Sequence, residues 1–336
     1  MKRLLINVSI IIFMKVSVIA QVKKIEWVEE TKKAAWQGRD SQGEFVYDNH
    51  LWILGGWDTP ETPNFLDAWK SPDGKSWTRA TEKAPWVQSD LPVSLVFKNK
   101  MWIMGGRKVP GTECSNKVWS STNGSSWNLV TSAAGWSPRL GAGYAVFKNR
   151  MWVLGGTNDF YHQNDTTLMN DIWSSADGKN WKLEVANAPW SKRAYLQAVV
   201  FNNKIWVMGG GKRQPVAVPT NDVWCSEDGI HWTEITPAAE WKPRLWFSSI
   251  LYRNRMWVLG GWSPETYNFG DVWYSKDGKI WTEFKSDVQW SKRHELSAWV
   301  FLDKIWVAGG AAEPNYELNS EVWSLKIPKD WFEKNK

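Results

Sequence analysis

Residues 136–156 read WSPRLGAGYAVFKNRMWVLGG, and this stretch decides the fold. Its small and apolar part, 140–147, predicts a β-strand that ends at Lys148-Asn149, a pair suited to a tight hairpin turn because Asn tolerates a positive φ. The apolar run 151–154 predicts a second strand, which the glycine pair closes. Two short strands joined by a tight turn therefore form the start of a β-sheet.

The chain continues this sheet beyond the glycine pair. After a long polar loop, residues 171–174 predict a third strand, and the turn Ala176-Asp177-Gly178-Lys179 leads into a fourth at 181–184. Helix-period patterning is absent from the sequence. One copy of the unit therefore predicts four short antiparallel strands, and the fold class is all-β.

The same unit returns six times, and four tryptophans mark each copy. They account for 24 of the 29 tryptophans in the 336 residues. The steps of sixteen, eight and nine residues between them are invariant in complete copies. A period of about 50 residues indicates supersecondary units that bury their apolar faces against one another. The four sets are Trp36, Trp86, Trp136, Trp190, Trp241 and Trp290; Trp52, Trp102, Trp152, Trp206, Trp257 and Trp306; Trp69, Trp119, Trp173, Trp224, Trp273 and Trp323; and Trp77, Trp127, Trp181, Trp232, Trp281 and Trp331.

Between roughly residues 25 and 331 the chain resembles the kelch family, the propeller class that also includes galactose-oxidase-like proteins. The resemblance rests on the paired aromatics and on a glycine pair that closes an apolar strand in each copy: Gly55-Gly56, Gly105-Gly106, Gly155-Gly156, Gly209-Gly210, Gly260-Gly261 and Gly309-Gly310. It implies an all-β, six-bladed kelch-type β-propeller with four antiparallel strands per blade. The chain departs from the family in its Trp-Trp pair and in turns such as Ser71-Pro72-Asp73-Gly74 and Ser275-Lys276-Asp277-Gly278, which resemble a shortened Asp-box, a folding element of sialidase-like propellers.

The ring has a predicted closure. Trp27 precedes Trp36 by nine residues, the step that elsewhere joins a fourth strand to the next copy. We therefore expect residues 25–30 to supply the outer strand of the last blade, which removes an open sheet edge. Trp331 competes for that place, although its approach lacks the Asp-Gly turn. The expected domain is a single propeller over 21–336, with blades at about 37–84, 87–134, 137–188, 191–239, 242–288 and 291–331.

The first twenty residues are expected to be a secretory signal peptide. Lys2 and Arg3 precede an apolar stretch, and cleavage is expected near Ala20. The protein is then secreted or periplasmic, without a membrane span. The net charge of +6 includes Lys2, Arg3 and Lys15 of this segment, so the rest of the chain carries a mild +3; it has no basic run, and no nucleic-acid partner is expected. Cys114 and Cys225 are expected to be free thiols, and the chain a monomer.

Connector lengths predict the functional rim. From the second glycine to the third tryptophan the step is 13, 13, 17, 14, 12 and 13 residues, so only the loop between second and third strands varies. Function is therefore expected on this rim. An arginine follows the first tryptophan by three residues in five copies, with Ser89 in the other, and could bind an anionic ligand at the channel mouth. The alternative is structural, a pair with the acid before the third tryptophan. These residues are Arg39, Arg139, Arg193, Arg244 and Arg293.

Residues that break the repeat are the other candidates. Trp57 and Trp262 each follow a glycine pair, in copies 1 and 5, which flank copy 6 in a closed ring. Trp246 is expected to point into the same sector, and copy 6 contributes His294 and Glu295. Flat aromatic faces, a carboxylate and guanidinium groups are what a sugar pocket uses. The alternative is that these tryptophans only pack neighbouring blades.

The expected function is binding of a ligand, a carbohydrate or another anionic molecule, on the variable rim. One alternative is a sugar-processing enzyme that uses Glu295 as catalytic residue. It would be similar either to sialic-acid mutarotases or to sialidases, for which Tyr161 and Tyr195 are further candidates. Another is a protein–protein scaffold. No cofactor and no metal site is predicted. A copper-radical site would need two His ligands, Tyr ligands and a Cys, but two of the four histidines fall on turns of the opposite rim, and no Cys/His zinc spacing occurs.

Overall fold

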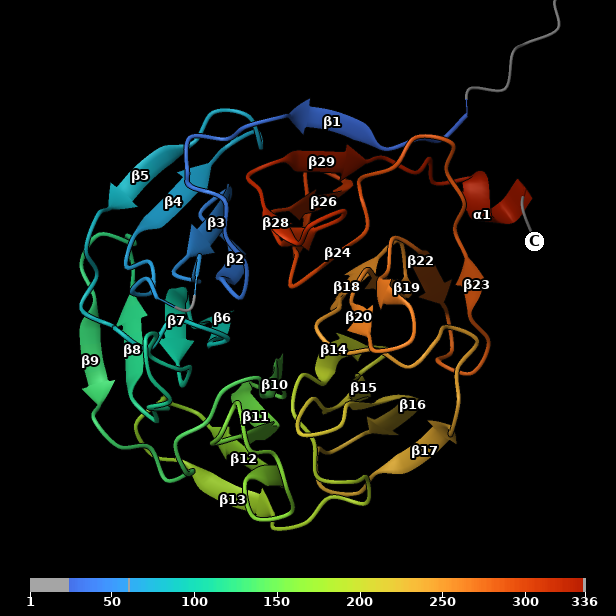
Figure 1. Cartoon of the computed structure of the whole chain (residues 1–336). Coiled ribbons are helices and arrows are strands. Elements are labelled where there is room, and N and C mark those ends of the chain that lie inside the picture. The colour runs from blue at the N-terminus through green and yellow to red at the C-terminus, as the bar shows by residue number, and fades with distance from the viewer. Residues whose placement is uncertain (1–23, 60, 335–336) are drawn as a thin grey trace, which may run out of the picture.

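A computed structural model describes residues 24–59 and 61–334, and this part of the chain forms six four-stranded antiparallel sheets arranged as a ring (Figure 1). Each sheet is one blade. The expected all-β fold is confirmed. The predicted signal segment, 1–20, lies outside the described residues.

The strands of the first three blades follow the chain order. Blade 1 holds β2 (Gly43–Tyr47), β3 (His50–Leu54), β4 (Ala68–Ser71) and β5 (Thr78–Thr81). Blade 2 holds β6 (Val93–Phe97), β7 (Lys100–Met104), β8 (Val118–Ser121) and β9 (Asn128–Thr131). Blade 3 holds β10 (Gly143–Phe147), β11 (Arg150–Thr157), β12 (Leu168–Ser175) and β13 (Lys182–Val185).

The other three blades include the closure of the ring. Blade 4 holds β14 (Gln197–Phe201), β15 (Lys204–Lys212), β16 (Val218–Ser226) and β17 (Thr233–Thr236). Blade 5 holds β18 (Ser248–Tyr252), β19 (Arg255–Leu259), β22 (Val272–Ser275) and β23 (Thr282–Glu283). Blade 6 holds β25 (Ser297–Phe301), β26 (Lys304–Ala308), β29 (Val322–Leu325) and, as its outer strand, β1 (Val28–Thr31).

Short strands lie on one rim of the ring, and a short helix lies near the C-terminus. Two small sheets pair β20 (Trp262–Ser263) with β21 (Tyr267–Asn268), and β24 (Arg293–His294) with β27 (Ala311–Ala312) and β28 (Glu317–Leu318). The helix α1 (Trp331–Lys334) lies outside the ring beside β23 (Figure 1). None of the helices in the described ranges is long and apolar enough to cross a membrane. Cys114 and Cys225 are free.

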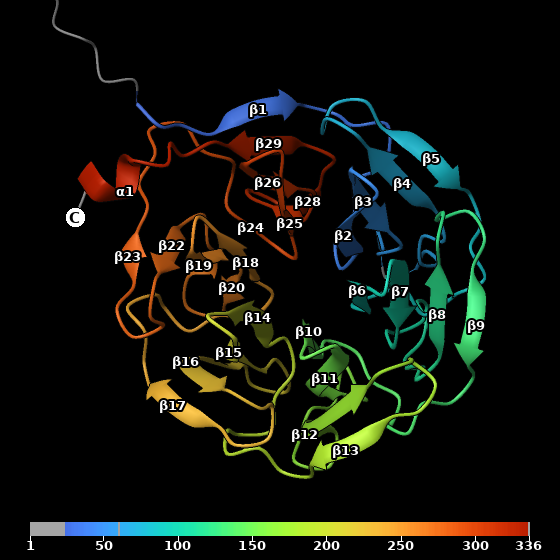
Figure 2. The same cartoon turned by 180° about the vertical axis from the view of Figure 1, so that it is seen from behind.

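The innermost strands surround a central channel. β2 contacts β6 on one side and β25 on the other, and the contacts continue through β10, β14 and β18, so the circle is complete (Figures 1 and 2). The hairpin turns that the sequence predicts are present, because Lys148 and Asn149 both have positive φ, at 47° and 57°. The channel is therefore lined by one strand of every blade.

The repeated tryptophans build the core of each blade. The first and fourth tryptophans of a blade meet edge to face, with ring centroids 4.7 to 6.0 Å apart, as in the pair Trp36–Trp77. This is a favoured geometry for aromatic pairs. The indole of the second tryptophan donates to a backbone carbonyl five residues earlier, as Trp52 does to Tyr47. The large number of tryptophans is therefore explained by their packing and hydrogen bonding within the blades.

The second tryptophan also joins neighbouring blades. Trp52 packs on the Asp-Gly-type turn of the next blade so closely that a Cβ on Gly124 would lie 2.2 Å from the ring. Trp257 of blade 5 would contact this turn in blade 6, but blade 6 lacks it. There Phe332 of α1 packs instead, with its ring centroid 6.2 Å from that of Trp257. Trp331, the competing candidate for a fourth strand, thus belongs to a helix that fills this gap.

The N-terminus closes the ring as predicted. β1 pairs antiparallel with β29, with Val28 opposite Ser324 and Glu29 opposite Trp323. Trp27 meets Trp290 edge to face, at 5.9 Å and 82°, and so takes the place that a fourth-strand tryptophan has in the other blades. The two ends of the chain therefore share one sheet.

Candidate functional site

One residue per blade narrows the channel near one rim. These six residues stand two positions after the repeated arginine or Ser89, and all have φ between 51° and 62°. Backbone hydrogen bonds link neighbours, as from the amide of Leu91 to the carbonyl of Ser41 and from the amide of Glu295 to the carbonyl of Trp246. We call them the neck ring: Ser41, Leu91, Gly141, Tyr195, Trp246 and Glu295.

The neck ring keeps one backbone conformation, although its six positions hold five different side chains and one glycine. A left-handed conformation costs a residue other than glycine roughly 1–2 kcal/mol. Strain of this kind in bulky residues is typical of functional positions. The ring lines a narrow cavity of about 80 Å³ inside the channel. The repeat therefore fixes the backbone here and leaves the side chains free for a specific task.

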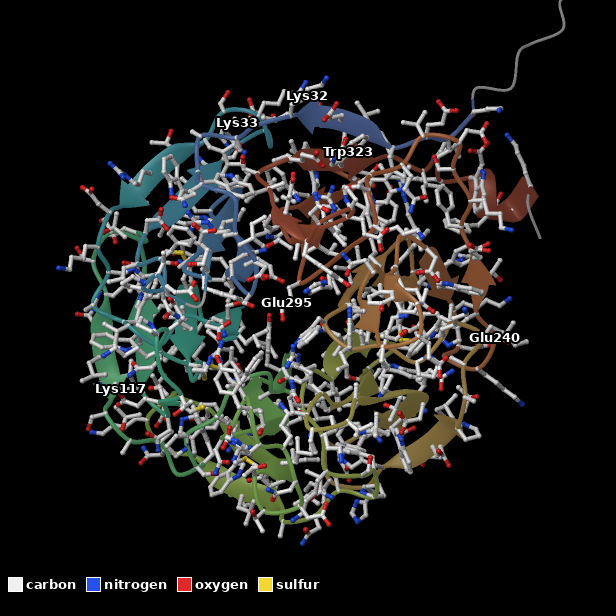
Figure 3. All side chains as sticks on the ribbon, viewed as in Figure 1. Lys32, Lys33, Lys117, Glu240, Glu295 and Trp323 are labelled. Atoms are coloured by element: carbon white, nitrogen blue, oxygen red, sulfur yellow. The ribbon has the colours of Figure 1, made fainter. Side chains whose placement is uncertain are left out.

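A larger pocket of about 480 Å³ lies over the ring, and we call it the mouth pocket. The loops between second and third strands of all six blades reach it, as the variable loop lengths predict. Each loop is held against the segment entering its own blade by a short β-bridge, for example between Asp40 and Trp57 and between Leu245 and Trp262. Figure 3 shows Glu295 at the centre of the molecule.

Aromatic side chains from four blades line the mouth pocket. This aromatic wall consists of Trp57, Phe160, Tyr161, Trp246, Trp262 and Tyr316. Trp246 is the centre of this wall, because its ring lies 5.4 Å from Trp262, 5.3 Å from Tyr195 and 5.2 Å from the stacked imidazole of His294. Leu140 and Leu245 support Tyr195 and Trp246 in one apolar cluster. Leu91, Tyr195 and Trp246 therefore form an apolar part of the neck.

Acidic residues of blades 6, 1 and 2 supply the polar groups near the neck. Ser41 donates a hydrogen bond of 2.5 Å from Oγ to Oε2 of Glu295. Asp40 and Asp90 are 4% and 1% exposed, and each leaves Oδ1 without a hydrogen-bond partner among the described residues. Asp90 pairs with Arg107, whose Nε and Nη2 both lie 2.6 Å from Oδ2.

These surroundings shift the ionisation of the acids. Burial, with the nearby carboxylate of Asp90, raises the pKa of Glu295 to about 7. Burial and the neighbouring Glu295 raise the pKa of Asp40 well above its usual range. Burial raises the pKa of Asp90 as well, although Arg107 opposes it. Burial and the charge of Arg213 lower the pKa of His294 to about 3, so its imidazole is neutral.

The repeated arginines do not reach this pocket, which corrects the expectation that they bind a ligand at its mouth. Their side chains are at most 3% exposed, and a guanidinium nitrogen lies 2.5 to 2.7 Å from a carboxylate oxygen of the acid before the third tryptophan. The same guanidinium donates to the carbonyl of the first glycine of the pair, as Arg139 does to Gly155. The pairs are Arg39–Asp67, Arg139–Asp171, Arg193–Asp222, Arg244–Asp271 and Arg293–Glu321.

Blade 2 explains why one arginine is missing. It has Ser89 in place of the arginine and also Lys117 in place of the acid. Since both members of the pair are replaced together, Ser89 is no sign of a ligand-binding role for the other arginines. Their role is to clamp the glycine pair to the third strand within each blade.

The structure does bring together the other candidates from the sequence. Trp57, Trp246, Trp262, His294 and Glu295 all line the mouth pocket. Sequence reasoning missed Asp40, Asp90, Arg107 and Arg213. A signal for one of them was present: Arg107 directly follows a glycine pair, the position that singled out Trp57 and Trp262.

Comparison with known families agrees with this architecture. A family model described as the KLHDC2/KLHL20/DRC7 Kelch-repeats domain matches residues 41–261. This match covers blades 1 to 4 and the first part of blade 5. A search of curated proteins gave no match.

Proposed function

The chain belongs to the kelch-repeat domain family, and we propose that it binds a saccharide in the mouth pocket. The observation that carries this proposal is that aromatic rings and acidic side chains line the same pocket. A sugar ring has a face of C–H groups, which stacks on indoles, and a rim of hydroxyls, which donate to carboxylates and accept from N–H groups. Both kinds of partner are present within one pocket.

The size and shape of the pocket support a small ligand. Its volume of about 480 Å³ falls within the range of small-molecule sites. Trp57 and Trp262 are partly exposed and come from loops on either side of blade 6, so a ring can lie between them and the neck. A flat protein partner would bury the outer loops and leave these inner groups without contacts.

Unused donors support a ligand rich in oxygen. Nε1 of Trp246, Nη1 of Arg107 and Nε of Arg213 are buried and have no partner in the described part of the chain. A buried donor without a partner is costly, and a bound ligand can remove that cost. These three groups line the mouth pocket and suit the hydroxyl, ring and carboxylate oxygens of a saccharide.

Arg213 suits an acidic saccharide in particular. No ion pair joins it to any of the described carboxylates, and its guanidinium lies 5.3 Å from the ring of Phe160 and 5.5 Å from that of Trp246. A guanidinium held by two aromatic rings is ready for a bidentate bond to a carboxylate. The proposal therefore extends to saccharides that carry one.

A glycan array of neutral and acidic saccharides tests this function. We expect the full chain to bind a defined subset, and Trp57→Ala or Trp262→Ala to weaken that binding about tenfold or more. Tyr267→Ala is the matched control, because this aromatic residue lies on the same rim and outside the pocket. Binding that survives both tryptophan substitutions would exclude the aromatic platform.

A second variant tests the acidic preference. Arg213→Gln is expected to weaken acidic saccharides selectively and to leave neutral ones within a factor of about two, since only the former lose a charge-assisted pair. Equal losses for both classes would mean that Arg213 only supports the fold of the pocket.

A further inference from the structure

Two acidic side chains and one imidazole converge in the mouth pocket. Asp40, His294 and Glu295 each offer one ligand atom, and these atoms all lie within 4.8 Å of one another. They come from the first and the last blade, which meet because the ring is closed. Carboxylate oxygens and imidazole nitrogens are the ligands of catalytic and binding sites for ions such as Zn²⁺.

No basic side chain is paired with the two carboxyl groups of this cluster. Arg107 forms its ion pair with Asp90, and no cationic side chain among the described residues forms one with Asp40 or Glu295. Asp40 is 4% exposed, lines the mouth pocket and has Oδ1 without a hydrogen-bond partner in the described ranges. Buried carboxyl groups are normally paired, protonated or bound to a metal ion, so this arrangement suits a bound cation.

The imidazole of His294 has one ring nitrogen held by a hydrogen bond. Nδ1 of His294 lies 2.6 Å from Oδ1 of Asn268, and the amide of Asn268 is fixed because its Nδ2 donates to the carbonyl of Ala311. Oδ1 is therefore the acceptor, Nδ1 carries the proton, and Nε2 keeps its lone pair. A ligating histidine typically donates its other ring N–H in this way.

The second carboxylate is also held in place. Ser41 binds Oε2 of Glu295, and Glu295 lines both the narrow cavity and the mouth pocket. Ligands of an ion with bonds of 2.0–2.2 Å lie roughly 3–4 Å apart, so the observed separations need only a small closing movement. Three protein ligands leave coordination positions open to the pocket.

We propose that Asp40, His294 and Glu295 bind one divalent transition-metal ion of the Zn²⁺ or Mn²⁺ type at the floor of the mouth pocket. Two carboxylates and one imidazole favour these ions over Cu⁺, which prefers sulfur, and over Ca²⁺, which prefers oxygen ligands alone. The open positions face the place of the proposed saccharide. Ion binding is nevertheless a property of the protein without sugar and is measured separately.

The test uses the full chain freed of metal with a chelator and then dialysed against Zn²⁺ or Mn²⁺ alone. One ion per chain is expected. Asp40→Asn and His294→Gln are expected to weaken binding at least a hundredfold, and Asn268→Ala ten- to a hundredfold, the usual effect of a group that orients a ligand. His231→Asn is the control, because His231 and Asp228 form an exposed pair on another turn that could chelate an ion at the surface.

Melting temperatures of the parent and of Asp40→Asn, measured with and without metal, provide a second test in case a variant folds poorly. Without metal, Asp40→Asn should melt at a higher temperature than the parent chain, because it removes a buried carboxyl group that lies close to Glu295 and Asp90. Added Zn²⁺ should raise the melting temperature of the parent and leave that of Asp40→Asn unchanged. The proposal is overturned if the parent binds no stoichiometric ion, or if only His231→Asn reduces binding.

Discussion

Oγ of Ser41 donates to Oε2 of Glu295, and this bond joins the first blade to the last at the floor of the mouth pocket. The pocket therefore exists only because the ring closes. Closure depends on β1, the N-terminal strand that pairs with β29 and completes blade 6. It also depends on Trp27, which packs against Trp290. Pairing of β1 with blade 6 therefore both stabilises the ring and brings the residues of the site together.

Trp27→Ala is expected to lower the free energy of unfolding by roughly 3–5 kcal/mol, the usual cost of removing a buried tryptophan. Trp27 is 1% exposed and contacts the core between blades 5 and 6. Val28→Ala is the control, since Val28 is 53% exposed and should stay within about 0.5 kcal/mol of the parent. Urea unfolding measures both. Equal effects of the two substitutions would show that β1 does not close the ring.

The ion pair between the repeated arginine and the acid of the third strand is tested in blade 3, where Arg139 and Asp171 are replaced by the residue types that blade 2 has at these positions. Arg139→Ser leaves Asp171 without its ion pair and is expected to cost about 3 kcal/mol of unfolding free energy. Adding Asp171→Lys, as in the Ser89 and Lys117 pair, should recover at least about 1 kcal/mol, because the uncompensated charge is gone.

The control for this swap is Arg79→Ser, an exposed arginine in β5 whose loss should change stability by about 0.5 kcal/mol or less. Saccharide binding should be the same in the folded double variant and in the parent. A double variant less stable than Arg139→Ser alone would contradict the structural role of the pair.

Acid is expected to loosen the closing strand through Glu30. Burial alone would raise the pKa of Glu30, but hydrogen bonds from Lys304, Lys75 and Ser324 outweigh burial and lower the pKa to about 2. A carboxyl with a lowered pKa stabilises the fold above its unfolded value of 4.5, and this contribution is lost as the pH falls from there toward 2.

The measurement is the free energy of unfolding against pH for the parent and for Glu30→Gln. The variant should show a smaller loss between pH 4.5 and 2 and should already be less stable at pH 7. Glu29→Gln, the neighbouring substitution, should keep the acid sensitivity of the parent. Parallel curves for the parent and Glu30→Gln would mean that another group controls the acid transition.

Much of the fold can be predicted from the sequence because the repeat is read from spacing alone. The nine-residue step from Trp27 to Trp36 predicts the closure, and the variable loops predict the rim on which the pocket lies. Trp57, Trp262 and Glu295 are found in the same way, as residues that break the pattern. Blades 5, 6 and 1 are neighbours in a closed ring, so the sequence also predicts that these residues share one pocket.

The rest of the site depends on side-chain directions that spacing does not contain. The repeated arginines obey the pattern, and whether they face the channel or the third strand is decided by the carboxylate two residues before a tryptophan, as Asp171 stands before Trp173. Asp40 and His294 lie at opposite ends of the chain, so no local motif marks them as one cluster. Only the closed ring places them together.

A crystal structure of the full chain with a saccharide selected on the array tests the central claim most directly. The account predicts that the sugar lies in the mouth pocket, with its apolar face on Trp262 or Trp57 and its hydroxyls toward Glu295 and Asp40. Density for the sugar on the outer edge of the blades, or on the opposite rim of the channel, would contradict it.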